Sequence, residues 1–484
     1  MLFNSFEYAI FLPLVFIVYW FLLNKSLTLQ NIFLLLVSYL FYSFWDWRFL
    51  FLLAFSTFLD YFTGLRISNA TSSDKKKIWL FISVFVNLGF LGFFKYYNFF
   101  IESFAELMSA IGLKAHLTTL NIILPVGISF YTFHGLSYVF DIYNKKIRPT
   151  TNWVEYALFV SFFPLLVAGP IERATHLLPQ VEKIRTFDYT KAVDGLRQIL
   201  WGLFKKIVIA DTCAVYVNLI FNNSESYSGS TLILGAVLFA FQIYGDFSGY
   251  TDIALGTARL LGFELLKNFS YPYFSRDIAE FWRRWHISLS TWFRDYLYIP
   301  LGGSRGGMYK KIRNTLIIFL VSGFWHGANW TFIVWGLLNA IYIMPSIILK
   351  TNRNHLDIVA SGKLFPSIKE AVQLFVTFAL TTFAWIFFRA NDLHHALSYI
   401  SGIFSYDLFS IPFLTHPELF KSIICIMLIV VFLVIEWIGR SNKYAIEKIG
   451  QRQHRLVRWA FYYAVAFSIL LSYGKNQEFI YFQF

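Results

Sequence analysis

Cysteine is almost absent from this chain of 484 residues, which contains 2 of them, Cys213 and Cys425, far apart in the sequence and within apolar segments. A disulfide framework requires patterned sets of cysteines, and a thiolate metal site requires more ligands than two isolated thiols. We therefore expect two buried structural thiols. The glycine-rich stretch 302–307 lacks the preceding strand and following helix of a nucleotide-binding loop. The sequence thus predicts neither a metal site nor a permanently bound cofactor.

Charge is also scarce, because charged residues make up only 14% of the chain while hydrophobic residues make up 57% and aromatic residues 21%. This composition excludes an ordinary soluble domain and is typical of a polytopic membrane protein. Long uncharged runs in lipid form helices, which satisfy their own backbone hydrogen bonds. The predicted fold class is therefore an all-α polytopic membrane protein.

The clearest uncharged runs are Ile78–Phe94, Ala371–Phe388, Ser422–Ile435 and Trp459–Gly474. Weaker runs begin near Phe6, Gln30, Phe49, Asn152, Ile207 and Thr231, and further apolar segments surround Ile122 and the centre of the chain. Together they predict roughly 11 to 13 membrane segments, some of them re-entrant. Because the sequence shows no repeat and no shift in composition, we expect a single integral membrane domain over residues 1–484.

The net charge of +13 is carried by short basic stretches beside apolar runs, which indicates membrane topology and contact with lipid, not nucleic-acid binding. Placing these stretches in the cytoplasm puts both chain termini outside. They are 75–77, 145–148, 283–305 and 452–458. The first apolar run has no basic segment before it and no cleavage site after it, so we expect a retained first span.

His326 lies in a central stretch, Asn314–Leu349, that contains no Asp, Glu, Lys or Arg. This stretch is longer than one upright span of roughly 20 residues, so it must tilt, break or fold back. Gly323, Gly327 and Asn329 provide the weak point beside the histidine. An imidazole at membrane depth is either a functional group or a hydrogen-bonded core histidine that ties a broken helix together.

Residues 263–313 form the least apolar long stretch of the chain. Aromatic and aliphatic residues recur there at helical spacing, which predicts one amphipathic helix along the cytoplasmic interface. They are Trp282, Trp285, Leu289, Trp292 and Tyr296. The helix is expected to end at Pro300, Gly302 and Gly303.

Several motifs together resemble the membrane-bound O-acyltransferase (MBOAT) family, and in particular its bacterial, alginate O-acetyltransferase (AlgI-like) branch. These motifs are Phe281–Ser290, Trp292–Gly303, Gly323–Gly327, Pro125–Phe133, Leu166–Arg173 and Tyr244–Asp252. The resemblance covers nearly the whole chain. It implies membrane helices in a ring around a central tunnel, in the plasma (inner) membrane of a bacterium, with a cytoplasmic acyl donor and an external acceptor.

The catalytic histidine of this family corresponds to His326. Transfer of an acyl group from a thioester to a hydroxyl requires a base, and neutral imidazole suits that role. Asn329 and the backbone near Gly323 and Gly327 are candidate donors for the oxyanion. The donor is expected to be acetyl-CoA or an acyl carrier protein thioester.

Four arginines, Arg283, Arg284, Arg294 and Arg305, are candidate ligands for the phosphates of the donor, or else ordinary positive-inside charge. His286, beside two of them, is expected to be structural or donor-binding. Asp246 and Asp252 flank a stretch expected to have irregular backbone, and pairing with an arginine is favoured over lining the tunnel.

The external tail, residues 475–484, ends in an aromatic segment that contains Tyr481. It resembles a terminal motif of this branch in which a tyrosine receives the acyl group. Tyr481 is therefore a candidate acyl relay to an extracytoplasmic SGNH-type acetyltransferase or esterase. The alternative is an aromatic anchor at the membrane interface.

The favoured function is O-acetylation of an exported, alginate-like polysaccharide, with peptidoglycan or another cell-wall polymer as alternative acceptors. A transporter is the alternative outside the enzyme class. The lack of a repeated half and the scarcity of intramembrane carboxylates stand against it.

Overall fold

The computed structural model describes residues 1–113, 118–167, 169–412, 419–449, 454–474, 477, 479 and 480. Across those residues the chain forms helices and connecting segments and no strand, so the predicted all-α class is confirmed. The helices pack into two compact units, Met1–Val193 with Thr257–Leu266, and Asp194–Gly256 with Lys267–Phe484. The single integral domain stays a prediction.

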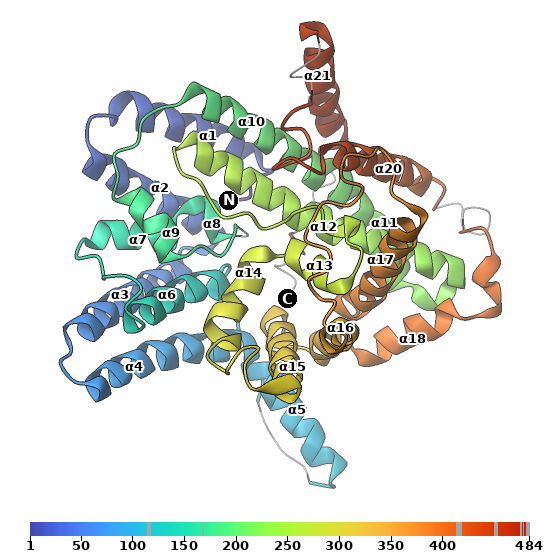
Figure 1. The fold of residues 1–484 in the computed structure, drawn as a ribbon, viewed down its shortest axis with the longest axis horizontal. Helices are drawn as coiled ribbons and strands as arrows, with labels where there is room; N and C mark the ends of the chain where they lie inside the picture. Colours follow the sequence, from blue (N-terminus) through green and yellow to red (C-terminus); the bar gives the residue numbers. More distant parts are fainter. Residues whose placement is uncertain are drawn as a thin grey trace. The chain divides into compact units, whose positions relative to one another are not determined.

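Among its described residues the first unit contains nine complete α-helices and two π-helical turns that extend two of them. The elements are α1 (Phe6–Ile17), η1 (Val18–Leu22), α2 (Leu27–Asp46), α3 (Arg48–Asn69), α4 (Ser73–Leu91), η2 (Gly92–Tyr96), α5 (Tyr97–Ala110), α6 (Ile128–Tyr143), α7 (Trp153–Ser161), α8 (Phe163–Leu166) and α9 (Ala174–Val181). Serine side chains cap the first turns of α1, α2 and α4 by accepting a backbone N–H. Helices α3, α4 and α6 lie side by side (Figure 1).

A buried polar network joins α3 to α4. The carboxylate of Asp60 accepts hydrogen bonds from Ser83 Oγ at 2.6 Å and Asn87 Nδ2 at 2.8 Å. Ser56 donates to Asn87 at 2.8 Å. Between apolar helices such interhelical hydrogen bonds supply the specificity that hydrophobic contact alone does not.

Helix α10 (Tyr189–Leu203) starts in the first unit and continues into the second. Helix α12 (Gly229–Leu260) lies mostly in the second unit and ends in the first. The other elements of the second unit are η3 (Phe204–Ala210), α11 (Asp211–Asn222), η4 (Ser224–Ser226), η5 (Pro272–Phe274), α13 (Ile278–Arg284), α14 (Ile287–Phe293), η6 (Arg294–Tyr298), α15 (Gly307–His326), α16 (Trp330–Ile348), α17 (Ile368–Arg389), α18 (Leu393–Ile403), η7 (Tyr406–Phe409), α20 (Ser422–Gly439) and α21 (Arg455–Ser472). The ring of Trp201 stacks on Phe204 and Phe432, which packs α10 and η3 against α20. The region predicted as 263–313 therefore contains η5, α13, α14, η6 and the start of α15.

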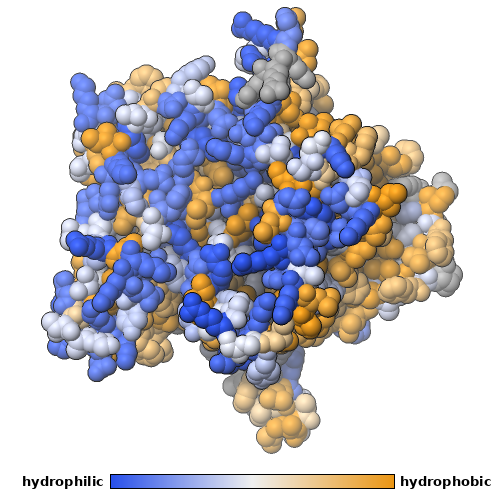
Figure 2. Space-filling model, in the orientation of Figure 1, coloured by the Kyte–Doolittle hydropathy of each residue, from blue (hydrophilic) through white to orange (hydrophobic). Residues whose placement is uncertain are grey.

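Seven helical segments of the described chain are long and apolar enough to cross a membrane. They are Leu27–Asp46, Arg48–Asn69, Ser73–Ala110, Gly229–Leu260, Trp330–Ile348, Ile368–Arg389 and Ser422–Gly439. Large apolar side chains remain exposed on α17, among them Val372 and Phe375 at 57% and 72%. Figure 2 shows hydrophobic side chains along the outer side of α17 and α18, whereas hydrophilic side chains gather over α13. An apolar surface of this extent is the surface that lipid covers. The chain is thus a multi-pass membrane protein, and the count of 11 to 13 segments stays a prediction.

The uncharged central stretch folds back on itself, as one of the predicted possibilities. Helix α15 ends at His326, α16 begins at Trp330, and the two helices lie side by side (Figure 1). The break lies at residues 327–329, where Gly327 is extended and Asn329 caps α16 by accepting the N–H of Thr331 at 3.0 Å. Gly323 is not part of the break.

Gly323 has a packing role instead. A Cβ on Gly323 would lie 3.1 Å from the carbonyl carbon of Phe332, and one on Gly336 equally close to that of Phe319. The two glycines therefore let the backbones of α15 and α16 approach closely. This contact fixes the end of α15, and with it His326, against α16.

Candidate active site

The imidazole of His326 is enclosed by aromatic rings. The side chain is buried, and its ring centre lies 4.9 Å from that of Trp325, 5.0 Å from Trp335 and 5.2 Å from Phe388. These rings come from α15, α16 and α17 and exclude bulk water, which strengthens electrostatic interactions inside the enclosure. The sequence predicted the histidine and the helix break, but not the rings from α16 and α17 that surround it.

A second histidine, His286, belongs to the same cluster. The centre of its ring lies 6.5 Å from that of His326 and 4.6 Å from that of Phe247. Its Nδ1 pairs with Asn268 Oδ1 at 3.0 Å, an oxygen that also accepts the hydroxyl of Ser288 at 2.9 Å. Because this oxygen is an acceptor, Nδ1 carries the proton and Nε2 presents a lone pair.

The Nε2 atom of His286 is buried without a hydrogen-bond partner among the described residues. Burial lowers the pKa of His286 to about 3, so the ring is neutral at physiological pH. A neutral imidazole with an unused acceptor is suited to receive a hydrogen bond from a ligand. The indole Nε1–H of Trp282 also has no hydrogen-bond partner among the described residues. The ring centre of Trp282 lies 5.7 Å from that of Trp335, which contacts His326.

The prediction of one amphipathic helix across Trp282–Tyr296 is wrong. Helix α13 ends at Arg284, and His286 has left-handed backbone angles, φ 42° and ψ 54°, before α14 begins at Ile287. Asn268 explains this break, because its side chain holds both His286 and Ser288. Trp285 and Leu289 are buried inside the protein, so this aromatic spacing marks a protein core.

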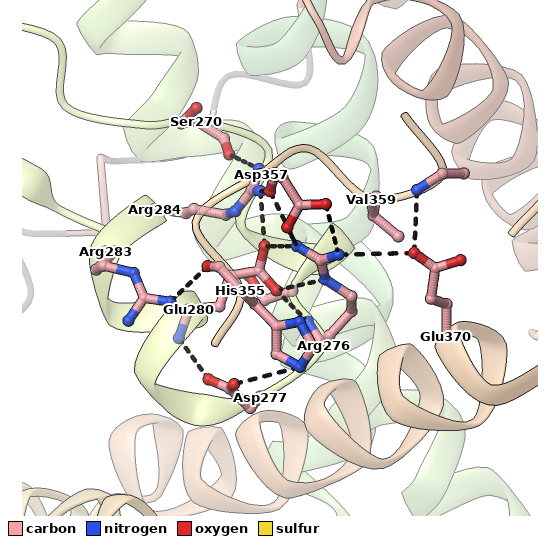
Figure 3. Close-up of polar contacts among 12 residues, drawn as sticks. Ser270, Arg276, Asp277, Glu280, Arg283, Arg284, His355, Asp357, Val359 and Glu370 are labelled. Atoms are coloured by element: carbon pink, nitrogen blue, oxygen red, sulfur yellow. Dashed lines mark hydrogen bonds and ion pairs between the residues drawn. The ribbon is translucent and has the colours of Figure 1, made fainter. Parts of the chain in front are cut away.

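Arg283 and Arg284 hold the segment between α16 and α17 against α13 (Figure 3). Arg283 donates to the carbonyls of Asn352 at 2.6 Å and His355 at 2.7 Å. Arg284 pairs with Glu280 at 2.7 Å and donates to the carbonyl of Asp357 at 3.1 Å. Both guanidinium groups are therefore occupied by this chain. We call Arg283, Arg284 and the segment 349–367 the clasp.

The centre of this network is an arginine that sequence reasoning missed. Arg276 pairs with Glu280 at 3.0 Å, Asp357 at 2.9 Å and Glu370 at 3.6 Å. Its buried guanidinium lowers the pKa of Asp357. In the sequence, the one indication of a role for Arg276 is its position directly before Asp277, the N-cap of α13. By contrast, Arg294 is exposed and pairs with its neighbour Asp295 at 2.8 Å, and Arg305 is exposed.

Neutralising Arg283 should open the clasp. Arg283→Gln removes two charge-assisted hydrogen bonds, each contributing about 1.5–3 kcal/mol. We expect trypsin to cut at Lys350, Arg353 or Lys363 about tenfold faster or more, as 1.4 kcal/mol corresponds to a factor of ten. Arg294→Gln removes the same charge from an exposed site and should leave the rate unchanged. Equal rates in both variants would show that Arg283 does not hold this segment.

The structure gives Asn329 a structural role at the start of α16. Besides accepting the N–H of Thr331, its side chain donates to the carbonyl of Asn391 at 2.7 Å. Tyr481 lies outside the described residues.

The thiols and carboxylates differ in part from the predictions. Cys213 and Cys425 are buried as expected, but their Sγ atoms lie 3.4 Å apart, on α11 and α20. The irregular backbone expected between Asp246 and Asp252 is wrong, because α12 is continuous there. Their partners are lysines, Lys206 and Lys205, and not an arginine.

The sequence of this chain is similar to one protein family and to several named proteins. Residues 144–384 match the model of the MBOAT, membrane-bound O-acyltransferase family. The chain is 38% identical over 416 residues to the probable alginate O-acetylase AlgI of Pseudomonas aeruginosa, covering 86% of this chain and 77% of that protein. It is 36% identical to the peptidoglycan O-acetyltransferase of Helicobacter pylori, covering 83% and 80% of the two chains.

A more distant relative is the teichoic acid D-alanyltransferase of Streptococcus thermophilus, 28% identical over 61% of this chain and 76% of that protein. The three relatives are named for acyl transfer to different polymers. The chain belongs to the membrane-bound O-acyltransferase family and is a multi-pass membrane O-acyltransferase.

Proposed function

We propose that this enzyme moves an acetyl group from a cytoplasmic thioester, acetyl-CoA or an acyl carrier protein, across the bacterial inner membrane to hydroxyl groups of a cell-envelope polysaccharide. Alginate and peptidoglycan are the acceptor polymers named for relatives of similar identity. The observation that carries the proposal is the enclosed His326 ring, 6.5 Å from the neutral ring of His286.

In this proposal His326 is the general base. It takes the proton of the attacking hydroxyl as the oxygen bonds to the acyl carbon of the thioester. The tetrahedral intermediate then breaks its carbon–sulfur bond, and the proton passes from His326 to the departing thiolate. The Nε2 lone pair of His286 accepts a hydrogen bond from the acyl thioester substrate or from the attacking hydroxyl. The indole N–H of Trp282 is a candidate hydrogen-bond donor to the oxyanion of the tetrahedral intermediate.

Tyr481 is the proposed first acceptor. Its support comes from Phe479, which is buried and packs with its ring centre 6.3 Å from that of Phe247. Phe247 contacts His286, which in turn contacts His326. Two further residues of chain extend at most on the order of 7 Å. Phe479 thus belongs to the same cluster of rings as the proposed base.

The partner follows from the direction of transfer. With both termini outside, a tyrosine ester formed on the tail faces the extracytoplasmic side. An SGNH-type acetyltransferase or esterase there would accept the acyl group and pass it to the polysaccharide, returning the free tyrosine hydroxyl. The alternative keeps the tail as an anchor and lets the partner's hydroxyl attack at His326 directly.

Donor recognition is assigned to Arg294 and Arg305. Their exposure leaves their guanidinium groups accessible to the phosphates of CoA or of a phosphopantetheine arm. Arg283 and Arg284 are not assigned to donor recognition, because their guanidinium groups already donate to carbonyls of the segment 349–367.

Release of free thiol by the purified protein in lipid nanodiscs tests enzyme against transporter. With the donor alone we expect at most one equivalent of CoA or carrier thiol per protein, from acylation of Tyr481. Continued release of thiol is expected only when donor and acceptor are both present. Arg294→Glu with Arg305→Glu should raise the KM for the donor and weaken its dependence on salt, because opposite charges steer association. The matched control is Lys75→Glu with Lys76→Glu, in a basic stretch expected on the same membrane face.

Three outcomes count against the proposal. Passage of a solute without thiol release would favour a transporter. Equal effects of the two double variants would mean that general surface charge, and not Arg294 and Arg305, sets donor use. An unchanged KM in both would remove the arginines from donor recognition.

A further inference from the structure

An ion cluster is buried in the apolar interior of the second unit. The Nζ atom of Lys206 lies 2.8 Å from a carboxylate oxygen of Asp211 and 2.7 Å from one of Asp246, and all three side chains are buried. Burying charge is costly unless every group finds partners. One lysine cannot satisfy two carboxylates, so the carboxylates need further hydrogen-bond donors. The third N–H of the Lys206 ammonium group also needs an acceptor.

The C-terminal tail supplies both. The backbone N–H of Ile480 donates to the second oxygen of Asp246 at 2.7 Å. Lys206 in turn donates to the backbone carbonyl of Gln477 at 3.2 Å. Asn218 donates to the side-chain carbonyl of Gln477 at 3.5 Å. Lys206 and Asp246, both charged groups, therefore contact the backbone of the tail and not its side chains.

An aromatic pocket lies between these two backbone contacts. The ring of Phe479 is fully buried, with its centre 4.3 Å from that of Tyr250 and 6.3 Å from that of Phe247. Tyr250 and Phe247 belong to α12, the helix that carries Asp246. One helix therefore provides both the acceptor for the tail backbone and the rings that hold its aromatic side chain.

We propose that Lys206, Asp211 and Asp246, together with Phe247 and Tyr250, form a docking site that binds Gln477, Phe479 and Ile480 in a fixed register. The site recognises the backbone carbonyl of Gln477, the N–H of Ile480 and the aromatic side chain of Phe479 between them. Fixing this register holds Phe479 against Phe247, whose ring contacts that of His286. Docking itself stands on these contacts, whereas its use in catalysis rests on the proposed relay by Tyr481.

Hydrogen exchange of the full-length protein, followed by mass spectrometry of the C-terminal peptide, measures docking without reference to activity. Ile480→Pro removes the N–H that Asp246 accepts and leaves the ion cluster unaltered. A hydrogen bond to a charged group contributes about 1.5–3 kcal/mol, so protection of the remaining tail amides should fall about tenfold or more. Gln477→Ala is the matched control, because it keeps the backbone carbonyl that Lys206 contacts and removes only the long side-chain contact with Asn218.

A second variant addresses the receptor side. Asp246→Ala should deprotect the tail in the same way, provided that the variant elutes as wild type in size-exclusion chromatography. If it does not, Tyr250→Ala, which removes the aromatic wall alone, replaces it. Acyl transfer is then measured in Ile480→Pro, where we expect a loss of about tenfold or more together with the loss of protection.

The outcomes separate the docking site from the proposed function. Unchanged protection in Ile480→Pro overturns the docking site, whatever the activity. Lost protection with normal transfer overturns its positioning role. If Tyr481→Phe transfers acyl groups normally while Ile480→Pro loses protection, the relay fails and the docking site stands as a structural anchor of the tail.

Discussion

Replacing His326 with glutamine stops acyl transfer while the protein still inserts and folds. A missing general base typically reduces the rate on the order of a hundred-fold to ten-thousand-fold. Glutamine keeps a polar side chain of similar size among the rings of Trp325, Trp335 and Phe388, so the packing of α15 on α16 is retained. Acetylation of polysaccharide in cells and thiol release in nanodiscs measure the effect.

The matched control is His394→Gln, which changes an exposed histidine on α18. It should transfer acyl groups at the wild-type rate. A His326→Gln protein that acetylates at a near wild-type rate would remove the base from the mechanism. The histidine would then be the core residue that ties a broken helix together.

Replacing Tyr481 with phenylalanine has the second large effect. The change removes one oxygen and keeps the ring, so an aromatic anchor would survive it. If Tyr481 is the relay, polysaccharide acylation should fall to background while the thioester donor still binds. The loss should be comparable to that in His326→Gln, because the proposed pathway has no other hydroxyl on the tail between Phe479 and Phe484.

Tyr463→Phe removes the same oxygen from an exposed ring on α21, the last helix before the tail. It should leave acylation unchanged. Normal product from Tyr481→Phe would return the tail to the role of an anchor and leave direct attack by a partner's hydroxyl at His326 as the simpler mechanism.

The parts of the site that depend on neighbouring residues in the chain were predictable. His326, its uncharged surroundings and the break at Gly327 and Asn329 all follow from the lengths that helices require in a bilayer. The resemblance of short motifs to a known family then supplied a role for the histidine. None of these inferences required knowledge of which helices meet.

The parts that depend on distant residues were not predictable in the same way. The spacing of Trp282 to Tyr296 suits a helix, but Asn268 holds His286 in a left-handed conformation and breaks it. Arg283 follows a positive-inside pattern, yet its guanidinium group donates hydrogen bonds to the carbonyls of residues 352 and 355. Periodicity and charge report local preference, and tertiary contacts override it.

Buried ion pairs show the same limit. Lys206 and Asp246 stand far apart in the sequence, and Lys206 lies in a run whose surroundings are apolar, so nothing local indicates that the two meet. The same is true of Cys213 and Cys425, whose sulfur atoms are neighbours in the structure. Contacts of this kind become visible only once α10 to α12 and α20 are packed.

The most direct test of the account is the mass of the C-terminal peptide after the purified protein has been given an isotopically labelled acetyl thioester and no partner. The account predicts one labelled acetyl group on Tyr481 in the wild type and none in His326→Gln. An unlabelled peptide in a wild-type protein that still acetylates polysaccharide, or equal labelling in His326→Gln, would contradict it.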